Sequence, residues 1–397
     1  MNNTIENPTP PTAMPPSPVL KENTTPPIPP FTFSEEQSIA IDRIMAWADP
    51  LSHTPTREFK LGGYAGTGKT TIIKEIIKRF NSLGLVVNLA AFTGKACNVL
   101  QRKGLSQAQT LHSLLYFTEV NTRTGEYTFH KRITLESSPD ILIVDEASMI
   151  STDLYHDMLL HTKLHFLFVG DPGQLEPVGD NPELMKSPHF TLSKIHRQAA
   201  QSPIITFAHD ICSGKAILKQ QNPALHIRDK LLPDDTLVKS SQVICGKNLT
   251  RTYLNQRIRR VLGFNTLAPQ MGEKLIILKN NQSFGVFNGM IVFVDEIKDT
   301  GSTWTMTFHD EVGNTYRRIP IWKAPFLQDG KLKQGQYCTR HEVHADFGYV
   351  ITCHKSQGSE WDMVTVIHEF VPPQIWDMKR WSYTAITRAA KQLTYAI

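Results

Sequence analysis

Residues 63–70 read GYAGTGKT and fit the pattern GxxxxGK followed by Ser or Thr, a glycine-rich loop that joins a buried strand to a helix. The context agrees, because an apolar run precedes the loop and the helix-compatible run KTTIIKEIIKRFNSLG follows it. Three later apolar runs, GLVVNLAAF, PDILIVDEA and LHFLFVGDP, each read as a buried strand that ends at a turn or polar site. Buried strands that alternate with helices are typical of a parallel sheet covered on both faces, so we predict an α/β fold.

The same loop predicts a nucleotide site. Its glycines allow backbone N–H groups to converge on phosphate oxygens, and the helix N-terminus adds partial positive charge. Lys69 is expected to reach the β- and γ-phosphates, and the Thr70 hydroxyl is suited to Mg²⁺. The remaining nucleotide-binding positions of the loop are Gly63, Ala65, Gly66, Thr67, Gly68 and Thr71. ATP and Mg²⁺ are therefore the predicted cofactors.

The run ILIVDEAS provides two carboxylates at the sheet edge where the phosphate loop also lies. Asp145 would hold Mg²⁺ directly or through water, and Glu146 would orient and deprotonate the attacking water. Acidic residues at a strand end are also common surface features, but a phosphate loop needs such a partner downstream. The sequence therefore predicts ATP hydrolysis.

Composition changes along the chain indicate the domain limits. Residues 1–30 hold ten of the 25 prolines and almost nothing that could pack, which predicts a disordered tail. This tail is either a flexible leader or a docking segment for single-stranded-DNA-binding or replication proteins. Residues 31–190 and 191–397 are predicted to form the first and second α/β domains.

Each α/β domain is expected to carry a β insert. At about 112–139, β-prone segments flank the turn-forming residues TRTG, which indicates a hairpin. At about 273–345, short β runs separated by turns are typical of a small antiparallel barrel.

Charge, cysteine usage and hydropathy narrow the function classes. A net charge of +5 permits a nucleic-acid partner without requiring one. The five cysteines are scattered and never form a CxxC pair, which argues against a disulfide framework or zinc site and favours a reducing cytosol. No apolar run reaches the roughly 18 residues that a membrane span needs, so no membrane partner is expected.

Six further segments, in addition to the phosphate loop and DEAS, resemble motifs of superfamily 1 DNA helicases of the RecD/Dda-like group. They are AAFTGKACNVL (90–100), AQTLHSLL (108–115), FVGDPGQLEPVG (168–179), KIHRQAAQSPI (194–204), YVITCHKSQGSEWDMVTV (349–366) and YTAITRAAKQL (383–393). The first departs from the group's pattern, because Phe92 replaces the usual proline. The resemblance covers roughly residues 33–397.

The resemblance implies two RecA-like parallel-sheet domains in tandem, with an SH3-like barrel as the insert of the second. It assigns Gln174 to γ-phosphate sensing, and Arg197 and Arg388 to the departing phosphate as arginine fingers. Gln37 would read adenine, and Gly358 and Glu360 would lie near the ribose or the phosphates. An ATP site between the two domains would then close and open during each catalytic cycle.

The same resemblance implies contacts to single-stranded and fork DNA. Its candidate strand-holding residues are Thr93 and Lys95 in the first domain and Thr352, His354 and Lys355 in the second. His112 is either a DNA contact or an internal coupling residue. The hairpin at about 116–131 resembles a pin that splits the duplex, with Phe117 or Phe129 stacking on the first base pair, although these rings could instead pack on the domain.

The function favoured by the sequence is an ATP-dependent 5′→3′ DNA helicase, acting as a monomer in the cytosol in DNA replication, repair or recombination. Two alternatives remain open. An RNA helicase of the Upf1-like branch would carry its barrel in the first domain rather than the second. An ATP-gated protein that binds or loads single strands would not need a pin.

Overall fold

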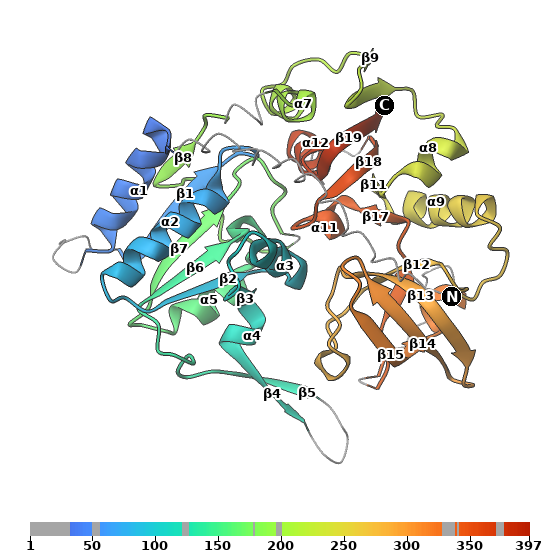
Figure 1. Ribbon diagram of the computed structural model, residues 1–397, viewed down its shortest axis with the longest axis horizontal. Coiled ribbons are helices and arrows are strands. Elements are labelled where there is room, and N and C mark those ends of the chain that lie inside the picture. The colour runs from blue at the N-terminus through green and yellow to red at the C-terminus, as the bar shows by residue number, and fades with distance from the viewer. Residues whose placement is uncertain are drawn as a thin grey trace, which may run out of the picture.

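The computed structural model describes residues 32–49, 56–120, 127–177, 179–195, 201–327, 338–339, 341–370 and 377–397. These residues form two α/β lobes side by side, with an antiparallel sheet below the second lobe (Figure 1). The predicted disordered tail, residues 1–30, lies outside the described residues. No described helix has the length and apolar character needed to cross a membrane.

The first lobe is built on a six-stranded parallel sheet with the order β3-β2-β6-β7-β1-β8. Its strands are β1 (Glu58–Gly63), β2 (Val87–Ala91), β3 (Gln109–Thr110), β6 (Ile141–Asp145), β7 (His165–Gly170) and β8 (Phe190–Leu192). Its helices are α1 (Glu35–Trp47), α2 (Lys69–Ser82), α3 (Gly94–Arg102), α4 (Leu111–Leu115), η1 (Ala147–Met149) and α5 (Thr152–Leu159). Because β8 pairs with β1, the first sheet extends across the predicted domain boundary between residues 190 and 191.

Alternating strand residues explain why helices cover both faces of this sheet. In β6, Ile141 and Ile143 pack in the core that α1, α2 and α3 complete. Their neighbours Leu142 and Val144 pack in the core beneath α4 and α5. A strand buried on both faces reads as a continuous apolar run, as ILIV does. The predicted parallel α/β architecture is therefore confirmed.

The second lobe contains another six-stranded sheet, with the order β17-β11-β18-β19-β10-β9, in which β9 runs antiparallel to β10 and the other pairs are parallel. Its strands are β9 (Gln220–Gln221), β10 (Leu225–Arg228), β11 (Gln242–Cys245), β17 (Val350–Thr352), β18 (Trp361–Ile367) and β19 (Ala389–Ala396). Its helices are α7 (Pro203–Cys212), α8 (Asp234–Lys239), α9 (Asn248–Val261), α11 (Cys353–Ser356) and α12 (Met378–Ile386).

A five-stranded antiparallel sheet with the order β15-β14-β13-β12-β16 is inserted between α9 and β17. Its elements are β12 (Lys274–Ile277), η2 (Gln282–Phe284), β13 (Ile291–Asp299), β14 (Thr303–Asp310), β15 (Thr315–Trp322), α10 (Ala324–Leu327) and β16 (Ala345–Phe347). Val343, just before β16, donates its N–H to the Pro320 carbonyl at 2.7 Å and accepts from the Trp322 N–H at 3.0 Å. These bonds bring the two edges of the sheet together in the region where the sequence predicts a barrel.

The hairpin of the first lobe consists of β4 (Tyr116–Val120) and β5 (Tyr127–Lys131), which pair in antiparallel register. It projects below the lobe, away from the parallel sheet (Figure 1). Asp157 on α5 anchors its base, because this carboxylate accepts a bond from the Tyr116 hydroxyl and lies 2.6 Å from the Lys131 ammonium. The turn of the hairpin, residues 121–126, lies outside the described residues.

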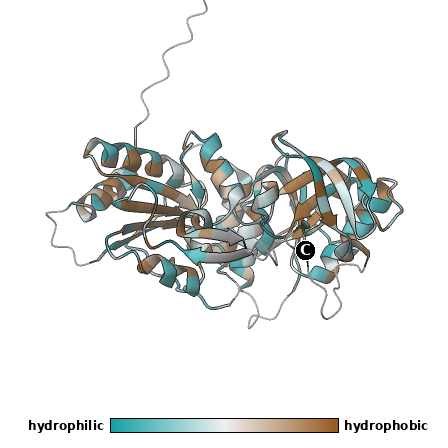
Figure 2. Cartoon of the chain, turned by 90° about the horizontal axis from the view of Figure 1, so that it is seen from below, coloured by the Kyte–Doolittle hydropathy of each residue, from teal (hydrophilic) through white to brown (hydrophobic). Residues whose placement is uncertain are grey.

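In Figure 2 strands of the first lobe carry the hydrophobic colour, whereas many residues of the surrounding helices carry the hydrophilic colour. Each α/β lobe has an apolar core, and the antiparallel sheet has a further one. The core of the second lobe also takes in Leu175 from the first lobe and Ile276 and Ile291 from the antiparallel sheet, so the three bodies are packed against one another.

Candidate functional site

A cavity of about 950 Å³ lies between the two α/β lobes. Thirteen residues that the sequence assigns to nucleotide chemistry line it: Gln37, Ala65, Gly66, Gly68, Lys69, Thr70, Thr71, Asp145, Glu146 and Gln174 from the first lobe, and Gly358, Glu360 and Arg388 from the second. Gly63 and Thr67 belong to the same loop but do not line the cavity. Arg197, the other predicted arginine finger, lies outside the described residues.

The loop between β1 and α2 depends on its glycines. Gly66 and Gly68 have φ values of 80° and 82°, in the left-handed region that L side chains rarely adopt. At Gly63 a Cβ atom would lie 2.9 Å from Thr67 Oγ1 and 3.0 Å from Lys69 Cγ. The loop can therefore keep its close backbone path, with N–H groups available to phosphate oxygens.

Lys69 begins α2 and is held by groups of its own lobe. Its ammonium donates to the carbonyls of Gly63 at 2.5 Å and Tyr64 at 3.2 Å, and lies 3.9 Å from Asp171 Oδ2. The Lys69 side chain therefore packs against the phosphate loop, where a bound phosphate would also lie. Phosphate oxygens could replace these partners without any movement of the helix.

Of the two predicted carboxylates, Asp145 is the last residue of β6 and Glu146 follows it. Burial, and then the charge of Glu146, raise the pKa of Asp145 above its ordinary value. A cation beside Asp145 would stabilise the ionised carboxylate in this buried position. The Thr70 hydroxyl lines the same cavity. Hydroxyl and carboxylate oxygens are the ligands that Mg²⁺ prefers, so these residues fit the ion. Glu146 has a left-handed backbone with φ 55°, which turns the chain sharply after the strand.

Two further predicted residues are buried at the cavity wall. Gln174 is 4% exposed, and its Oε1 has no hydrogen-bond partner among the described residues. An unpaired buried oxygen is costly, which makes it a ready acceptor for a bound water or ligand. Arg388 is 6% exposed and donates to the carbonyls of Thr384 and Ser359 and to the Thr387 hydroxyl. To reach a phosphate, this guanidinium would have to exchange some of these bonds.

Gln37 serves the structure as well as the cavity. Its Oε1 accepts from the Ser34 N–H at 3.1 Å and completes a capping box that starts α1. Its Nε2 donates to the Thr67 carbonyl at 3.2 Å, so the amide fixes the first turn of α1 against the phosphate loop. The predicted role in reading adenine stays a prediction.

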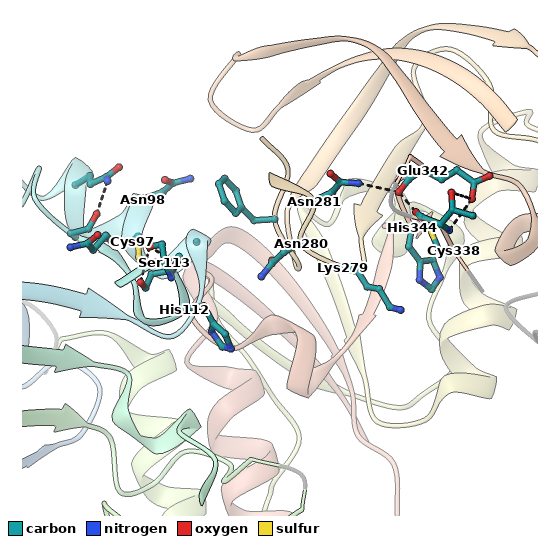
Figure 3. Close-up of a pocket in the computed structure, with 17 residues that line it drawn as sticks. Cys97, Asn98, His112, Ser113, Lys279, Asn280, Asn281, Cys338, Glu342 and His344 are labelled. Carbon is teal, nitrogen blue, oxygen red and sulfur yellow. Dashed lines mark hydrogen bonds between the residues drawn. The ribbon is translucent and has the colours of Figure 1, made fainter. Parts of the chain in front are cut away.

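A second cavity, of about 690 Å³, separates the first lobe from the antiparallel sheet (Figure 3). Asn98, His112 and Ser113 face it from the first lobe, while Lys279 and His344 face it from the sheet. The lining combines amides, hydroxyls, one lysine and the carboxylate of Glu342 with the ring of Phe287. The lysine and the aromatic ring are suited to a single nucleic-acid strand, whereas the carboxylate would repel a phosphate.

Lys95, for which DNA contact stays a prediction, is engaged by groups of the other two bodies. Its ammonium lies 2.7 Å from Glu311 Oε2 in the antiparallel sheet and 4.1 Å from the centre of the Trp361 ring in the second lobe. The Trp361 Nε1–H donates to the other oxygen of Glu311 at 2.8 Å. Lys95 therefore joins all three bodies, and burial lowers its pKa. Thr93, its neighbour, caps α3 by accepting from the Ala96 N–H at 3.1 Å.

The remaining DNA candidates are spread over several surfaces. Thr352 occupies the N-cap position of α11 without a capping side-chain bond. Lys355 on that helix donates to Asn288 in the loop before β13 at 2.9 Å, and His354 lies between them, half-buried. Phe117 is 46% exposed and stacks on His130, with 5.2 Å between the ring centres. The side chain of Phe129 lies outside the described residues.

Sequence reasoning missed four residues that organise these sites: Asp171, Glu311, Trp361 and Tyr383. The position of Asp171 could have been noticed in the sequence, because it lies at the end of a buried strand, as Asp145 does. Glu311 lies in a turn and gives no such signal, and the roles of Trp361 and Tyr383 depend on contacts between lobes.

Comparisons with known proteins agree with this arrangement. A family model described as an AAA domain matches residues 33–229, and one described as a UvrD-like helicase C-terminal domain matches residues 347–394. The RecBCD enzyme subunit RecD of Buchnera aphidicola is 34% identical, over 83% of this chain and 69% of the relative. The ATP-dependent RecD2 DNA helicase of Deinococcus radiodurans is 30% identical, over 90% of this chain and 48% of the relative.

A third relative, the ATP-dependent DNA helicase dda of Enterobacteria phage T4, is 30% identical over 46% of this chain and 43% of its own length. The chain thus spans about half the length of the first relatives that it matches. Among solved structures, Bacteroides Pif1 bound to ssDNA covers 92% of each chain with a TM-score of 0.56 and 19% identity. At that identity the likeness shows the fold alone.

Proposed function

Because the chain belongs to the RecD/Dda-like group of superfamily 1 helicases, we propose that it is an ATP-driven motor that moves 5′→3′ along single-stranded DNA and unwinds duplex DNA. The observation that carries the proposal is the cavity between the lobes, to which the phosphate loop contributes from one side and Arg388 from the other. A nucleotide bound there contacts both lobes, so its hydrolysis can change their relative position. Such a motor would serve DNA replication, repair or recombination.

In the proposed reaction Lys69 binds the β- and γ-phosphates, and Glu146 takes the proton of the attacking water. Gln174 accepts a hydrogen bond from that water with its otherwise unpaired Oε1, whereas its Nε2–H group would be the donor to the γ-phosphate. Asp145 and Thr70 would hold Mg²⁺, which supplies positive charge to the phosphate oxygens when bound. Arg388 then stabilises the charge that develops on the departing phosphate from the second lobe.

Movement along DNA requires that each body hold the strand in turn, mainly through phosphates and stacked bases. The cavity between the first lobe and the antiparallel sheet supports this requirement, since its walls come from two different bodies. His112 and Lys279 are candidate phosphate contacts there, and the Phe287 ring is a candidate stacking surface. The strand path proposed here therefore runs beside the nucleotide cavity.

The decisive experiment measures ATP-dependent strand separation on partial duplexes with a 5′ or a 3′ single-stranded tail, in DNA and in RNA. The proposal expects unwinding of the 5′-tailed DNA substrate. Unwinding of RNA would favour the Upf1-like alternative. DNA-dependent ATP hydrolysis without strand separation on any substrate would favour the loading protein.

If the β4–β5 hairpin splits the duplex, changing Phe117 and Phe129 to alanine should slow unwinding several-fold and leave DNA-stimulated ATPase nearly unchanged. Opening a base pair costs on the order of 1–2 kcal/mol, and stacking of a ring on the exposed pair can offset a comparable amount. Stopped-flow unwinding of a tailed duplex and steady-state ATPase assays check this. Parallel losses of both activities would show that the hairpin supports the fold or the strand path instead.

The ion pair of Lys95 leads to a prediction on DNA affinity. Glu311→Gln should tighten single-stranded DNA binding about fivefold, since a phosphate would no longer compete with a carboxylate for this ammonium, an effect of ~1 kcal/mol. Fluorescence anisotropy with a labelled oligonucleotide measures the change. Glu296→Gln, which removes an equal charge from the exposed side of the same sheet, is the control and should change the affinity little. Weaker binding by Glu311→Gln would mean that Glu311 positions Lys95 for DNA.

A further inference from the structure

Tyr383 belongs to α12 in the second lobe, yet its hydroxyl lies inside the first. The hydroxyl accepts a hydrogen bond from the Ala65 N–H at 2.7 Å and donates one to Asp171 Oδ2 at 2.8 Å. The side chain is fully buried, and so is Asp171. One hydroxyl from the second lobe thus contacts both the phosphate loop and the carboxylate nearest to Lys69.

Asp171 follows β7, and both of its oxygens are engaged. Oδ1 accepts from the Gly173 N–H at 2.9 Å, while Oδ2 receives the tyrosine hydroxyl and lies 3.9 Å from the Lys69 ammonium. A buried carboxylate needs such partners, because desolvation otherwise makes its charge costly. When a phosphate draws Lys69 away, the Tyr383 hydroxyl becomes the main remaining side-chain donor to Asp171 among the contacts of the described residues.

The loop that follows Asp171 is tied to the second lobe by further bonds. The Leu175 N–H donates to Thr384 Oγ1 at 2.8 Å, and its carbonyl accepts from Gln357 Nε2 at 2.8 Å. Glu176 forms an ion pair with Arg380, one turn before Tyr383 in α12. Any shift of Asp171 is therefore transmitted to α12, which ends at Ile386, two residues before Arg388.

From these contacts we propose that Tyr383 is a positioning residue that reports the occupancy of the phosphate site to the second lobe. Without nucleotide the Tyr383 hydroxyl accepts a hydrogen bond from the Ala65 N–H, and both this hydroxyl and the Lys69 ammonium lie beside Asp171. With a triphosphate bound, Lys69 moves to phosphate, Asp171 relies on the hydroxyl, and α12 moves with the carboxylate toward the cavity. Burial raises the pKa of Tyr383, so the phenol keeps the proton that it donates. This inference rests on the proposed ATP-driven cycle and adds the residue that links the phosphate site to the second lobe.

Tyr383→Phe tests the inference, because it removes the hydroxyl and keeps the ring. Tyr395→Phe is the matched control: Tyr395 is equally buried in the same lobe, but its hydroxyl donates to Ser382 of α12 at 2.8 Å and contacts His368, both in the second lobe. The dissociation constant for a labelled single-stranded oligonucleotide is measured twice, once with a non-hydrolysable ATP analogue and once with ADP. The readout is the ratio of these two dissociation constants. DNA-stimulated kcat and the KM for ATP are measured in parallel.

Tyr383→Phe should bring the two dissociation constants to within about twofold of each other and lower kcat about tenfold, a change of roughly 1.4 kcal/mol, with KM changed far less. Tyr395→Phe should keep the wild-type ratio and rate. A Tyr383→Phe protein that behaves like the control overturns the inference. If wild-type protein shows neither DNA-stimulated ATPase nor a nucleotide-dependent DNA affinity, the proposed function fails instead.

Thermal unfolding separates these outcomes from a loss of fold. If Tyr383→Phe does not fold, Asp171→Asn replaces it, because the amide keeps the shape of the carboxylate and weakens the bond with the hydroxyl. It should reproduce the loss of nucleotide-dependent DNA affinity. An Asp171→Asn protein with the wild-type ratio would equally overturn the inference.

Discussion

Lys69→Ala is expected to lower ATP turnover by about 10²–10³-fold, the usual loss when a preorganised positive group is removed from a charged transition state. The ammonium would contact the β- and γ-phosphates, where charge develops during hydrolysis. The fold should persist, since the present hydrogen bonds of the ammonium go to the loop carbonyls of Gly63 and Tyr64. The loss of stability should be about 1–3 kcal/mol, because the buried Asp171 loses a cation 3.9 Å away but keeps its bonds to Tyr383 and Gly173.

Steady-state ATP hydrolysis with saturating single-stranded DNA, together with thermal unfolding, checks both parts of this prediction. Lys78→Ala is the matched control, because Lys78 lies on the same helix, is exposed and does not line the cavity between the lobes. The control should keep its turnover within about twofold. A folded Lys69→Ala protein with near-normal turnover would show that nucleotide binds elsewhere.

The sequence allowed the α/β sheets to be predicted, together with thirteen of the residues that line the cavity between the lobes, for a local physical reason. A phosphate loop, its strand and its helix are contiguous in the chain, and residues such as Ile141 to Val144 show burial on both faces of a strand directly. The carboxyl ends of parallel strands meet at one edge of the sheet, so residues of short motifs at these ends lie close together. Lys69, Asp145 and Glu146 accordingly line one cavity.

Contacts between separate bodies could not be predicted in this way. The sequence around Lys95 shows only that this residue comes shortly after a buried strand. Its partners Glu311 and Trp361 come from the antiparallel sheet and the second lobe. The Tyr383 hydroxyl meets Ala65, which lies 318 residues earlier in the chain. Such pairings depend on how whole domains pack, and no periodicity or spacing within one segment encodes them.

Glu146→Gln should bind ATP and single-stranded DNA but turn over about 10²–10⁴-fold more slowly, the range by which a positioned general base accelerates proton transfer. The amide keeps the size and most of the polar contacts of the side chain and loses its basicity. The backbone at this position is left-handed with φ 55°, and glutamine meets the same steric cost there as glutamate, so the fold should not change.

The test compares this variant with Glu183→Gln, which makes the same substitution at another left-handed residue, φ 51°, outside the cavity. Pre-steady-state hydrolysis and equilibrium binding of a fluorescent ATP analogue separate chemistry from affinity. The control should match wild type in both. If Glu146→Gln turned over within about threefold of wild type, a difference of only ~0.7 kcal/mol, Glu146 could not be the base. Its place after β6 would then serve to orient Asp145, whose Oδ1 accepts from the Glu146 N–H at 3.0 Å, and the proton of the attacking water would have to pass to another group lining the cavity.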